Sequence, residues 1–329
     1  MSEIGRSRHI SVNGVSLHVT EAGEGPLVLL CHGWPELAYA WRHQIPALAA
    51  AGYHVAAPDL RGFGRSEAPR DVEAYSVLHL VGDMVGLVGA LGAREAVIVG
   101  HDWGANIAWA SALLRPDLFR AVAALSVPFR ARAPAPPVRT MIAAGWSRFY
   151  WVYFQDAGVA EAEFERDVDQ TLRCILGGLS ATDAPRDPSE VLMLPEGGGF
   201  LDMLRCPERL PDWLGEVDLA VMAGAFQSTG FRGGLNYYRN LDRNWELMAP
   251  WEGMLIRQPA LFVAGTHDPV ILSQLGRRAM EEMPRQVPGL RPIVLIEGAG
   301  HWIQQERPAE VSAALLEFLA TCASAGGHR

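Results

Sequence analysis

The sequence contains no lysine, so all 28 of its basic residues are arginines. Aspartate and glutamate outnumber them at 37, which gives a formal net charge of −9 at pH 7. The sequence has no basic patch and no arginine-rich helix face. A protein that binds nucleic acid through its phosphates needs such a surface, so this composition argues against that class.

Long apolar runs are also missing. None approaches the roughly 20 residues of a membrane-spanning helix, and residues 1–9 are polar and lack the apolar centre of a signal peptide. We therefore expect a cytoplasmic protein without a membrane span. The chain has four cysteines, none with metal-ligand spacing, and in a reducing cytosol we expect free thiols at all of them: Cys31, Cys174, Cys206 and Cys322.

Strand and helix patterns alternate over the first part of the chain. A hairpin is expected at His9–Ala22, around the turn signal Asn13-Gly14. Short apolar runs typical of fully buried strands follow at Pro26–Cys31, His54–Pro58, Ala96–Val99 and Ala121–Val127. Helical patterns lie between them at Leu37–Ala50 and Tyr75–Leu91. This alternation predicts an α/β protein with a parallel sheet and helices on both faces.

The alternation stops between Arg130 and about Trp251, where no clean buried strand occurs. A proline-rich linker opens this segment, and helical patterns such as Val159–Leu176 follow. So long a segment is too much for a loop. We predict a core made of residues 1–130 and 252–329, with a helical lid inserted at 131–251.

The strongest local signal is Gly100–Gly104, which reads Gly-His-Asp-Trp-Gly directly after a buried strand. Two glycines around a central residue, between a strand and a helix, are typical of a nucleophile elbow. The central residue is Asp102, where esterases and lipases carry serine. An aspartate that merely forms an Asx turn is the alternative, and it does not require both glycines.

Two further residues follow late strands in the chain order of the α/β-hydrolase triad. Asp268 comes after the apolar run Ala260–Ala264, and His301 follows the strand pattern Pro292–Ile296. Because the carboxyl ends of parallel strands meet at one edge of a sheet, we expect both near Asp102. A helix N-cap is the simpler alternative for Asp268.

An aspartate nucleophile suits displacement at a saturated carbon. Its carboxylate is ionised at neutral pH and attacks without a base, which forms an alkyl ester. We expect His301, oriented by Asp268, to activate the water that cleaves this ester. The backbone N–H groups of Trp34 and Trp103 are expected to stabilise the oxyanion.

Two aromatic stretches of the predicted lid, Phe149–Gln155 and Asn236–Arg239, indicate the leaving group. Aromatic clusters more often belong to a core than to a catalytic site. A phenol, however, can donate a hydrogen bond to a strained ether oxygen and then protonate the alkoxide. Two phenols above Asp102 would therefore hold an epoxide oxygen.

Nearly the whole chain resembles the epoxide hydrolases of the α/β-hydrolase fold. The resemblance is carried by His32–Glu36, Asp59–Ser66, Gly100–Gly104, Tyr150–Glu165, Asn236–Arg239 and Gly300–Trp302. The lid segments are the specific ones, because haloalkane dehalogenases share the core motifs. The resemblance implies a mostly parallel eight-stranded sheet, a small-molecule epoxide as the substrate, and no metal or other cofactor.

The resemblance also assigns residues. Tyr150 and Tyr238 match the two lid tyrosines, with Tyr153 and Tyr237 as their neighbours. The family's His-Gly-x-Pro segment supplies an oxyanion donor at Trp34.

The resemblance also assigns supporting roles to three other residues of this segment. Pro35 is expected to follow a cis peptide bond, His32 to support the loop, and Glu36 to help hold the hydrolytic water. We also expect three aromatic side chains to line the substrate pocket: Trp34, Trp103 and Phe154.

Two alternatives remain open. A haloalkane dehalogenase uses the same nucleophile, but its halide is commonly bound by an asparagine at the position of Trp34 and by a lid tryptophan. A non-enzymatic binding protein on this fold should have lost a triad member, and all three are present. We therefore expect an epoxide hydrolase that acts on a small molecule, as a monomer or a homodimer.

Overall fold

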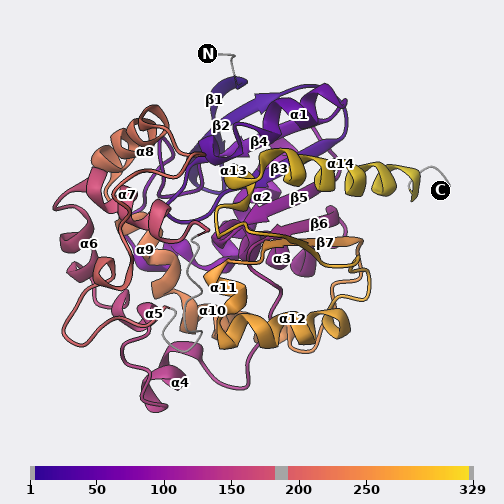
Figure 1. Ribbon diagram of the computed structural model, residues 1–329. Helices are drawn as coiled ribbons and strands as arrows, with labels where there is room; N and C mark the ends of the chain where they lie inside the picture. The colour runs from indigo at the N-terminus through magenta and orange to yellow at the C-terminus, as the bar shows by residue number, and fades with distance from the viewer. Residues whose placement is uncertain (1–3, 182–191, 326–329) are drawn as a thin grey trace.

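The computed structural model describes residues 4–181 and 192–325 (Figure 1). Eight strands form one sheet in the order β1-β2-β4-β3-β5-β6-β7-β8. The pairs β1–β2 and β2–β4 are antiparallel and the others are parallel, which confirms the predicted mostly parallel α/β sheet. The strands are β1 Arg6–Val12, β2 Val15–Ala22, β3 Leu27–Cys31, β4 His54–Pro58, β5 Ala96–His101, β6 Phe119–Leu125, β7 Ala260–Gly265 and β8 Val294–Ile296.

The strands follow from their local sequences. Asn13 and Gly14 both have positive φ, 49° and 77°, as a tight hairpin turn requires, and they join β1 to β2. Away from the two edge strands of the sheet, β3, β5 and β7 are buried at every position. Such strands are covered on both faces, which explains their continuous apolar sequences.

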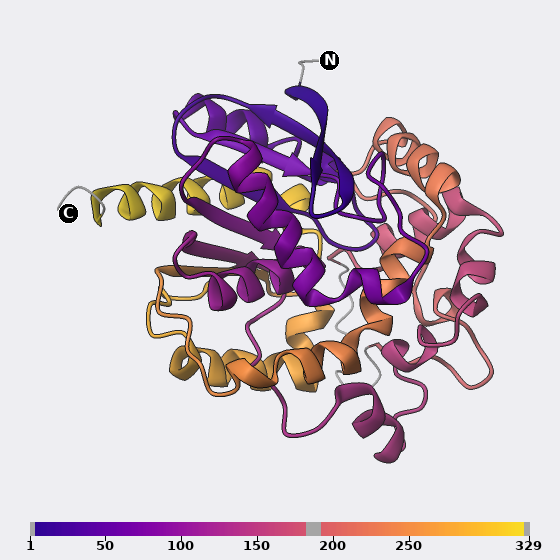
Figure 2. The same cartoon turned by 180° about the vertical axis from the view of Figure 1, so that it is seen from behind.

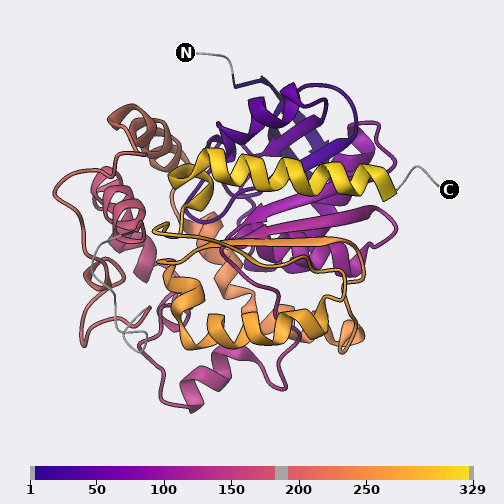
Figure 3. The ribbon, with the colours of Figure 1, turned by 45° about the vertical axis from the view of Figure 1, so that its right-hand side comes forward.

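Helices cover both faces of this sheet. Along β5, Ala96 and Ile98 pack toward α2 and α3, which lie in front of the sheet in Figure 2. Val97 and Val99 pack on the opposite face, where α14 crosses the sheet in Figure 3. The core helices are α1 Gln44–Ala50, α2 Val77–Ala90, α3 Trp103–Leu114, α11 Pro269–Leu272, α12 Gln274–Gln286, α13 Ile303–Glu306 and α14 Pro308–Ala325.

In the described residues between β6 and β7 the chain forms seven α-helices, which gather to one side of the sheet in Figure 1. In the described part of this segment the only β pairing is the isolated bridge between Phe149 and Met193. The helices are α4 Pro137–Ala143, α5 Tyr150–Tyr153, α6 Val159–Phe164, α7 Val168–Gly178, α8 Glu216–Thr229, α9 Arg232–Arg239 and α10 Leu241–Leu247. The domain boundaries at 130/131 and 251/252 stay a prediction.

Two of the helices predicted from the sequence are each formed as two shorter helices. The pattern at Leu37–Ala50 forms a 3₁₀ helix, Ala38–Trp41, and then α1. The pattern at Val159–Leu176 forms α6 and α7, because the Asp167 carboxylate accepts the Gln170 N–H and so starts a new helix. Within the described ranges, no helix is both long enough and apolar enough to cross a membrane.

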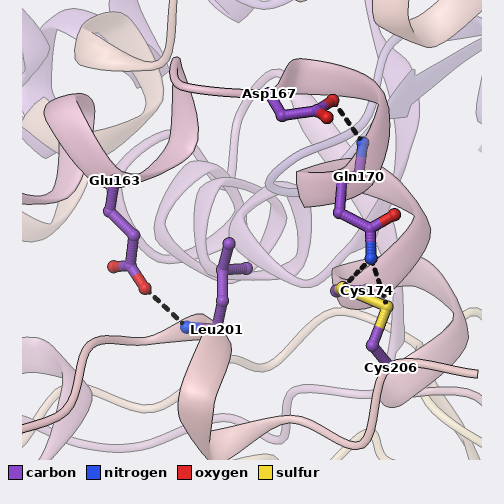
Figure 4. The surroundings of a disulfide bond; sticks show 6 residues. All are labelled: Glu163, Asp167, Gln170, Cys174, Leu201 and Cys206. Carbon is purple, nitrogen blue, oxygen red and sulfur yellow. Dashed lines mark hydrogen bonds between the residues drawn. A yellow bond between two sulfur atoms is a disulfide. The ribbon is translucent and has the colours of Figure 1, made fainter.

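One sequence-based prediction is wrong. Cys174, on α7, and Cys206 form a disulfide whose Cα atoms lie 4.2 Å apart (Figure 4). The Gln170 amide donates to both sulfur atoms, over 3.3 Å and 3.1 Å. The expectation of free thiols holds for Cys31 and Cys322, which are buried. The 32-residue separation of the bonded pair carries no signal in the sequence, since the fold of this segment brings the two together.

Candidate active site

Asp102 lies at a strained turn between β5 and α3. Its φ of 51° and ψ of −114° place a non-glycine residue in a region that costs about 1–3 kcal/mol. The flanking glycines are sterically required. A Cβ atom on Gly100 would overlap the Gly104 carbonyl oxygen, and one on Gly104 would overlap the Cys31 carbonyl oxygen. The nucleophile elbow predicted at Gly100–Gly104 is therefore present in the backbone.

The loop after β3 holds one oxygen of the Asp102 carboxylate. The Trp34 backbone N–H donates to Asp102 Oδ1 over 2.9 Å. Gly33 has to be glycine because a Cβ there would lie 2.5 Å from the Asp102 Cβ. The peptide bond between Trp34 and Pro35 is cis, as the resemblance implies.

Asp268 and His301 meet Asp102 at the carboxyl edge of the sheet. His301 Nε2 lies 3.7 Å from Asp102 Oδ2. On the other side of the ring, His301 Nδ1 lies 3.1 Å and 3.2 Å from the two Asp268 oxygens. Asp268 also caps α11 by accepting the Val270 N–H, so the N-cap alternative holds for it, and its triad role stays a prediction.

The charges around Asp102 and His301 shift the pKa values of both residues. Burial alone would lower the pKa of His301, but the negative charges of Asp268 and Asp102 raise it well above its usual value. Burial would raise the pKa of Asp102, but its interaction with His301 and the Trp34 N–H lower it. The two aspartates therefore favour the charged, imidazolium form of His301.

Hydrogen bonds to three other residues hold the backbone of His301 in place. Its N–H donates to the Leu179 carbonyl oxygen over 3.1 Å. Its carbonyl oxygen accepts from His101 Nε2 over 2.8 Å and from the Ser126 hydroxyl over 2.9 Å. These contacts position the imidazole above the sheet edge.

Glu36 connects the loop after β3 to His101 and to two glutamines of α13. Its Oε2 accepts from the Gly33 N–H and lies 2.8 Å from His101 Nδ1, and its Oε1 accepts from two amides, those of Gln304 and Gln305. Burial would raise the pKa of Glu36, but His101 holds it below its usual value. These contacts fit a positioning role, and the predicted contact with the hydrolytic water stays a prediction.

His32 supports the same loop. Its Nε2 accepts the Leu60 N–H over 2.9 Å, and its Nδ1 donates to the Gly33 carbonyl oxygen over 2.8 Å. This arrangement fixes the neutral tautomer with the proton on Nδ1.

Tyr150, at the start of α5, and Tyr238, in α9, face each other with ring centroids 5.7 Å apart. Tyr238 also packs on the Trp103 ring at 5.0 Å. Burial, reinforced by the charge of Asp102, raises the pKa of both phenols, so both stay protonated and able to donate.

The neighbouring tyrosines have other partners. The Tyr237 hydroxyl donates to the Arg61 carbonyl oxygen over 3.0 Å, and the Tyr153 hydroxyl donates to Glu163 over 2.8 Å. Both are therefore engaged away from Asp102.

A cavity of about 700 Å³ opens beside Asp102. Asp102, Trp103, Tyr150 and Tyr238 line it, and it continues along α3 toward α10 and α12. Its walls are mostly apolar, as is usual for a site that binds a small organic molecule.

Trp103 lies among the residues that line this cavity, whereas Trp34 and Phe154 do not, and the substrate contacts of all three side chains stay predictions. The Trp34 and Phe154 rings pack against each other at 5.4 Å. Both also pack on Tyr238, at 5.9 Å and 4.9 Å. They therefore form the layer behind the tyrosines, and Trp34 contributes through its backbone.

Sequence reasoning missed His101 and Ser126 as supports of the site. The one available signal for His101 is its position next to Asp102, because alternation along a strand turns its side chain to the opposite face. Ser126 gave no signal. Among residues 4–181 and 192–325, no three His, Cys, Asp or Glu side chains gather as a metal site would require.

Comparisons with known proteins agree on one group. A family model described as the alpha/beta hydrolase fold matches residues 26–308. The chain is 51% identical over 317 residues to epoxide hydrolase A of Mycobacterium tuberculosis (strain ATCC 25618 / H37Rv), which covers 95% of this chain and 96% of that protein. It is 43% identical over 314 residues to epoxide hydrolase 2 of Siraitia grosvenorii, covering 94% and 96%.

Solved structures give the same result. An epoxide hydrolase from an endophytic Streptomyces superposes with a TM-score of 0.93 at 44% identity, covering 98% of this chain and 97% of that one. Epoxide hydrolase A from Mycobacterium thermoresistibile superposes with a TM-score of 0.89 at 48% identity, covering 96% and 98%.

Proposed function

The chain belongs to the epoxide hydrolases of the α/β-hydrolase fold, and we propose that it opens its epoxide by forming an ester with Asp102. The reaction converts an epoxide and water into a vicinal diol. The observation that carries the proposal is the setting of the Asp102 carboxylate, with the Trp34 N–H on Oδ1, His301 beside Oδ2 and two phenols opposite.

In the first step Asp102 Oδ2 attacks a carbon of the oxirane. The C–O bond of the ring breaks, and its electron pair goes to the ring oxygen. Tyr150 and Tyr238 donate hydrogen bonds to that oxygen, and one of them transfers its proton to it. The product is an alkyl ester on Asp102 that bears a free hydroxyl on the neighbouring carbon.

Forming the ester removes the negative charge of Asp102. One of the two carboxylates that raise the pKa of His301 is then gone, so the imidazolium releases its proton, which restores the phenol. Neutral His301 takes a proton from water, and the hydroxide adds to the carboxyl carbon of Asp102. The Trp34 and Trp103 N–H groups stabilise the oxyanion, and His301 gives its proton to the departing diol oxygen. The regenerated Asp102 carboxyl group then passes its proton to His301, which restores the carboxylate and the imidazolium.

The segment 131–251 acts as the lid in this scheme, because it supplies both phenols. Its apolar inner surface, together with α3, forms the cavity for the rest of the epoxide molecule. A cavity of about 700 Å³ accommodates substrates considerably larger than the oxirane itself.

A paired assay tests the function. Diol formation from styrene oxide and halide release from 1-bromobutane are measured side by side, with Asp102→Ala as the inactive control. We expect diol without halide from the wild type, and neither product from the variant. Halide without diol would indicate a haloalkane dehalogenase and return the tyrosines to a packing role.

A further inference from the structure

The disulfide between Cys174 and Cys206 fixes a second segment of the chain to the end of α7 (Figure 4). Cys174 lies about one turn before the end of this helix. Cys206 belongs to residues 204–207, which pack directly on the last turn of α7. The contact is so close that a Cβ atom on Gly177 would overlap the Pro207 ring. The bridge therefore restrains the C-terminal turn of α7.

The same helix end contacts the loop that carries His301. Leu179, the residue directly after α7, accepts the His301 N–H over 3.1 Å through its carbonyl oxygen. The carbonyl oxygen of Leu176, in the last turn of α7, accepts the indole N–H of Trp302 over 2.8 Å. Carbonyl groups at a helix end have no partner within the helix, so they are available for such contacts. His301 and the residue after it are both bound to the end of α7.

Glu306, the last residue of α13, strengthens this connection. One oxygen of its carboxylate accepts the Gly300 N–H over 2.8 Å and the Ala181 N–H over 3.2 Å. The other oxygen accepts the Trp302 N–H over 3.0 Å. Gly300 and Trp302 flank His301 in the chain, so the backbone on both sides of His301 is held together with a residue that follows α7.

We propose that the Cys174–Cys206 disulfide is a positioning element for His301, and that its reduction slows hydrolysis of the Asp102 ester more than formation of that ester. The inference rests on the proposed function, since it concerns the second step of that mechanism. In the first step the Asp102 carboxylate attacks without a base, whereas in the second step His301 takes a proton from water. A displaced imidazole therefore affects mainly the second step.

Two different parts of the molecule hold the His301 backbone. Its N–H is bound by Leu179, from the helical segment between β6 and β7, and its carbonyl oxygen is bound by His101 and Ser126 at the sheet. When the bridge is open, residues 204–207 no longer restrain α7, so the N–H side loses support while the carbonyl side keeps its donors. The imidazole then turns relative to the nucleophile, and a small misplacement of a reacting group is costly in rate.

A dithiol reductant can open the bridge, because Cys206 is exposed. A thiolate of the reductant attacks one sulfur atom, and the S–S bond breaks as a mixed disulfide forms. The second thiol of the reductant then displaces the protein sulfur and closes a cyclic disulfide. In total the reductant gives up two electrons and two protons, and Cys174 and Cys206 become thiols.

The test measures the two steps separately, in the oxidised enzyme and after treatment with dithiothreitol. Rapid mixing with saturating styrene oxide, acid quench and intact-protein mass spectrometry give the rate constants for ester formation and ester hydrolysis. Both are first-order rate constants, so they do not depend on the fraction of the sample that is folded. We expect reduction to lower the hydrolysis rate constant about tenfold and to change the formation rate constant less than about twofold.

Two variants complete the test. The double variant Cys174→Ser/Cys206→Ser should show the slow hydrolysis without reductant and no response to it, and it decides the question even if the bridge resists dithiothreitol. Cys322→Ser removes a buried free thiol of α14 and should respond to the reductant as the wild type does. Circular dichroism at the assay temperature verifies that the bridged and unbridged forms are folded.

Equal rate constants in the bridged and unbridged forms would overturn the inference and leave the proposed function intact. A fall of both steps by the same factor, or of ester formation alone, would also overturn it, by showing that the bridge supports the helical segment as a whole rather than His301. If diol forms but no ester can be trapped on Asp102 in any form, the proposed mechanism fails and the inference fails with it.

Discussion

The two oxygens of the Asp102 carboxylate are held differently: Oδ1 accepts the Trp34 N–H over 2.9 Å, whereas Oδ2 lies 3.7 Å from His301 Nε2. In the proposed mechanism, the donor on Oδ1 keeps that oxygen in the oxyanion position, and Oδ2 attacks the epoxide and becomes the ester oxygen.

Replacing the base should separate the two steps. His301→Gln leaves the Asp102 nucleophile in place but removes the group that activates water. We expect a single burst of epoxide consumption followed by turnover reduced roughly 10³-fold or more. Intact-protein mass spectrometry should show the enzyme heavier by one epoxide. Normal turnover by this variant would rule out His301 as the base.

The two phenols should act as a pair. In Tyr150→Phe or Tyr238→Phe one donor remains on the epoxide oxygen, so kcat/KM for styrene oxide should fall about 10-fold to 100-fold. The double variant should lose far more than the product of the two single losses, since no acid is left. Tyr237→Phe is the matched control: its hydroxyl serves the Arg61 carbonyl oxygen, and it should affect stability rather than the chemical step. If the loss in the double variant equals the product of the two single losses, the two hydroxyls do not act on the same epoxide oxygen.

The pKa of His301 predicts a pH dependence of stability. Because the folded-state pKa is raised above 6.5, the charged imidazolium stabilises the fold fully below about pH 6.5, and this contribution is lost as the pH rises through the folded-state pKa. Asp102→Asn removes one of the two carboxylates. Its His301 should titrate at lower pH, as NMR of the ring protons can measure. An unchanged midpoint would contradict the coupling on which ester hydrolysis depends.

The disulfide between Cys174 and Cys206 should stabilise the fold. It closes a 32-residue loop, for which the chain-entropy model gives about 3–4 kcal/mol of free energy of unfolding. Replacing both Cys174 and Cys206 by serine should lower the urea midpoint by a corresponding amount. A thiol reductant should lower the wild-type midpoint similarly and leave the double variant unchanged. If reduction has no effect, the bridge contributes nothing to stability.

The sequence is most informative where backbone geometry restricts residue choice. Gly100 and Gly104 are sterically required around Asp102, so the elbow could be located from residue types alone. The order of Asp102, Asp268 and His301 after three strands predicted that these residues meet at one edge of the sheet, and the structure does bring them together. The lid tyrosines came from a resemblance, since periodicity alone cannot separate a phenol above the nucleophile from one in the core.

Long-range side-chain contacts were beyond prediction. Glu36 and His101 are 65 residues apart in the sequence, and only the folded sheet brings them to 2.8 Å. Cys174 and Cys206 meet for the same kind of reason. The place of Phe154 behind Tyr238 has a related reason, because the sequence motif does not say which side of an aromatic layer faces the cavity. Such contacts depend on packing between distant elements rather than on local pattern.

The measurement that tests the central claim most directly is a single turnover in water labelled with heavy oxygen, H₂¹⁸O, with enzyme in excess over styrene oxide. If the epoxide is opened by Asp102 Oδ2 and water attacks the carboxyl carbon, the label enters the Asp102 side chain and the first diol carries unlabelled oxygen. Peptide mass spectrometry locates the label. Label in the first diol, with none in Asp102, would mean that water opens the ring directly and would contradict the ester mechanism.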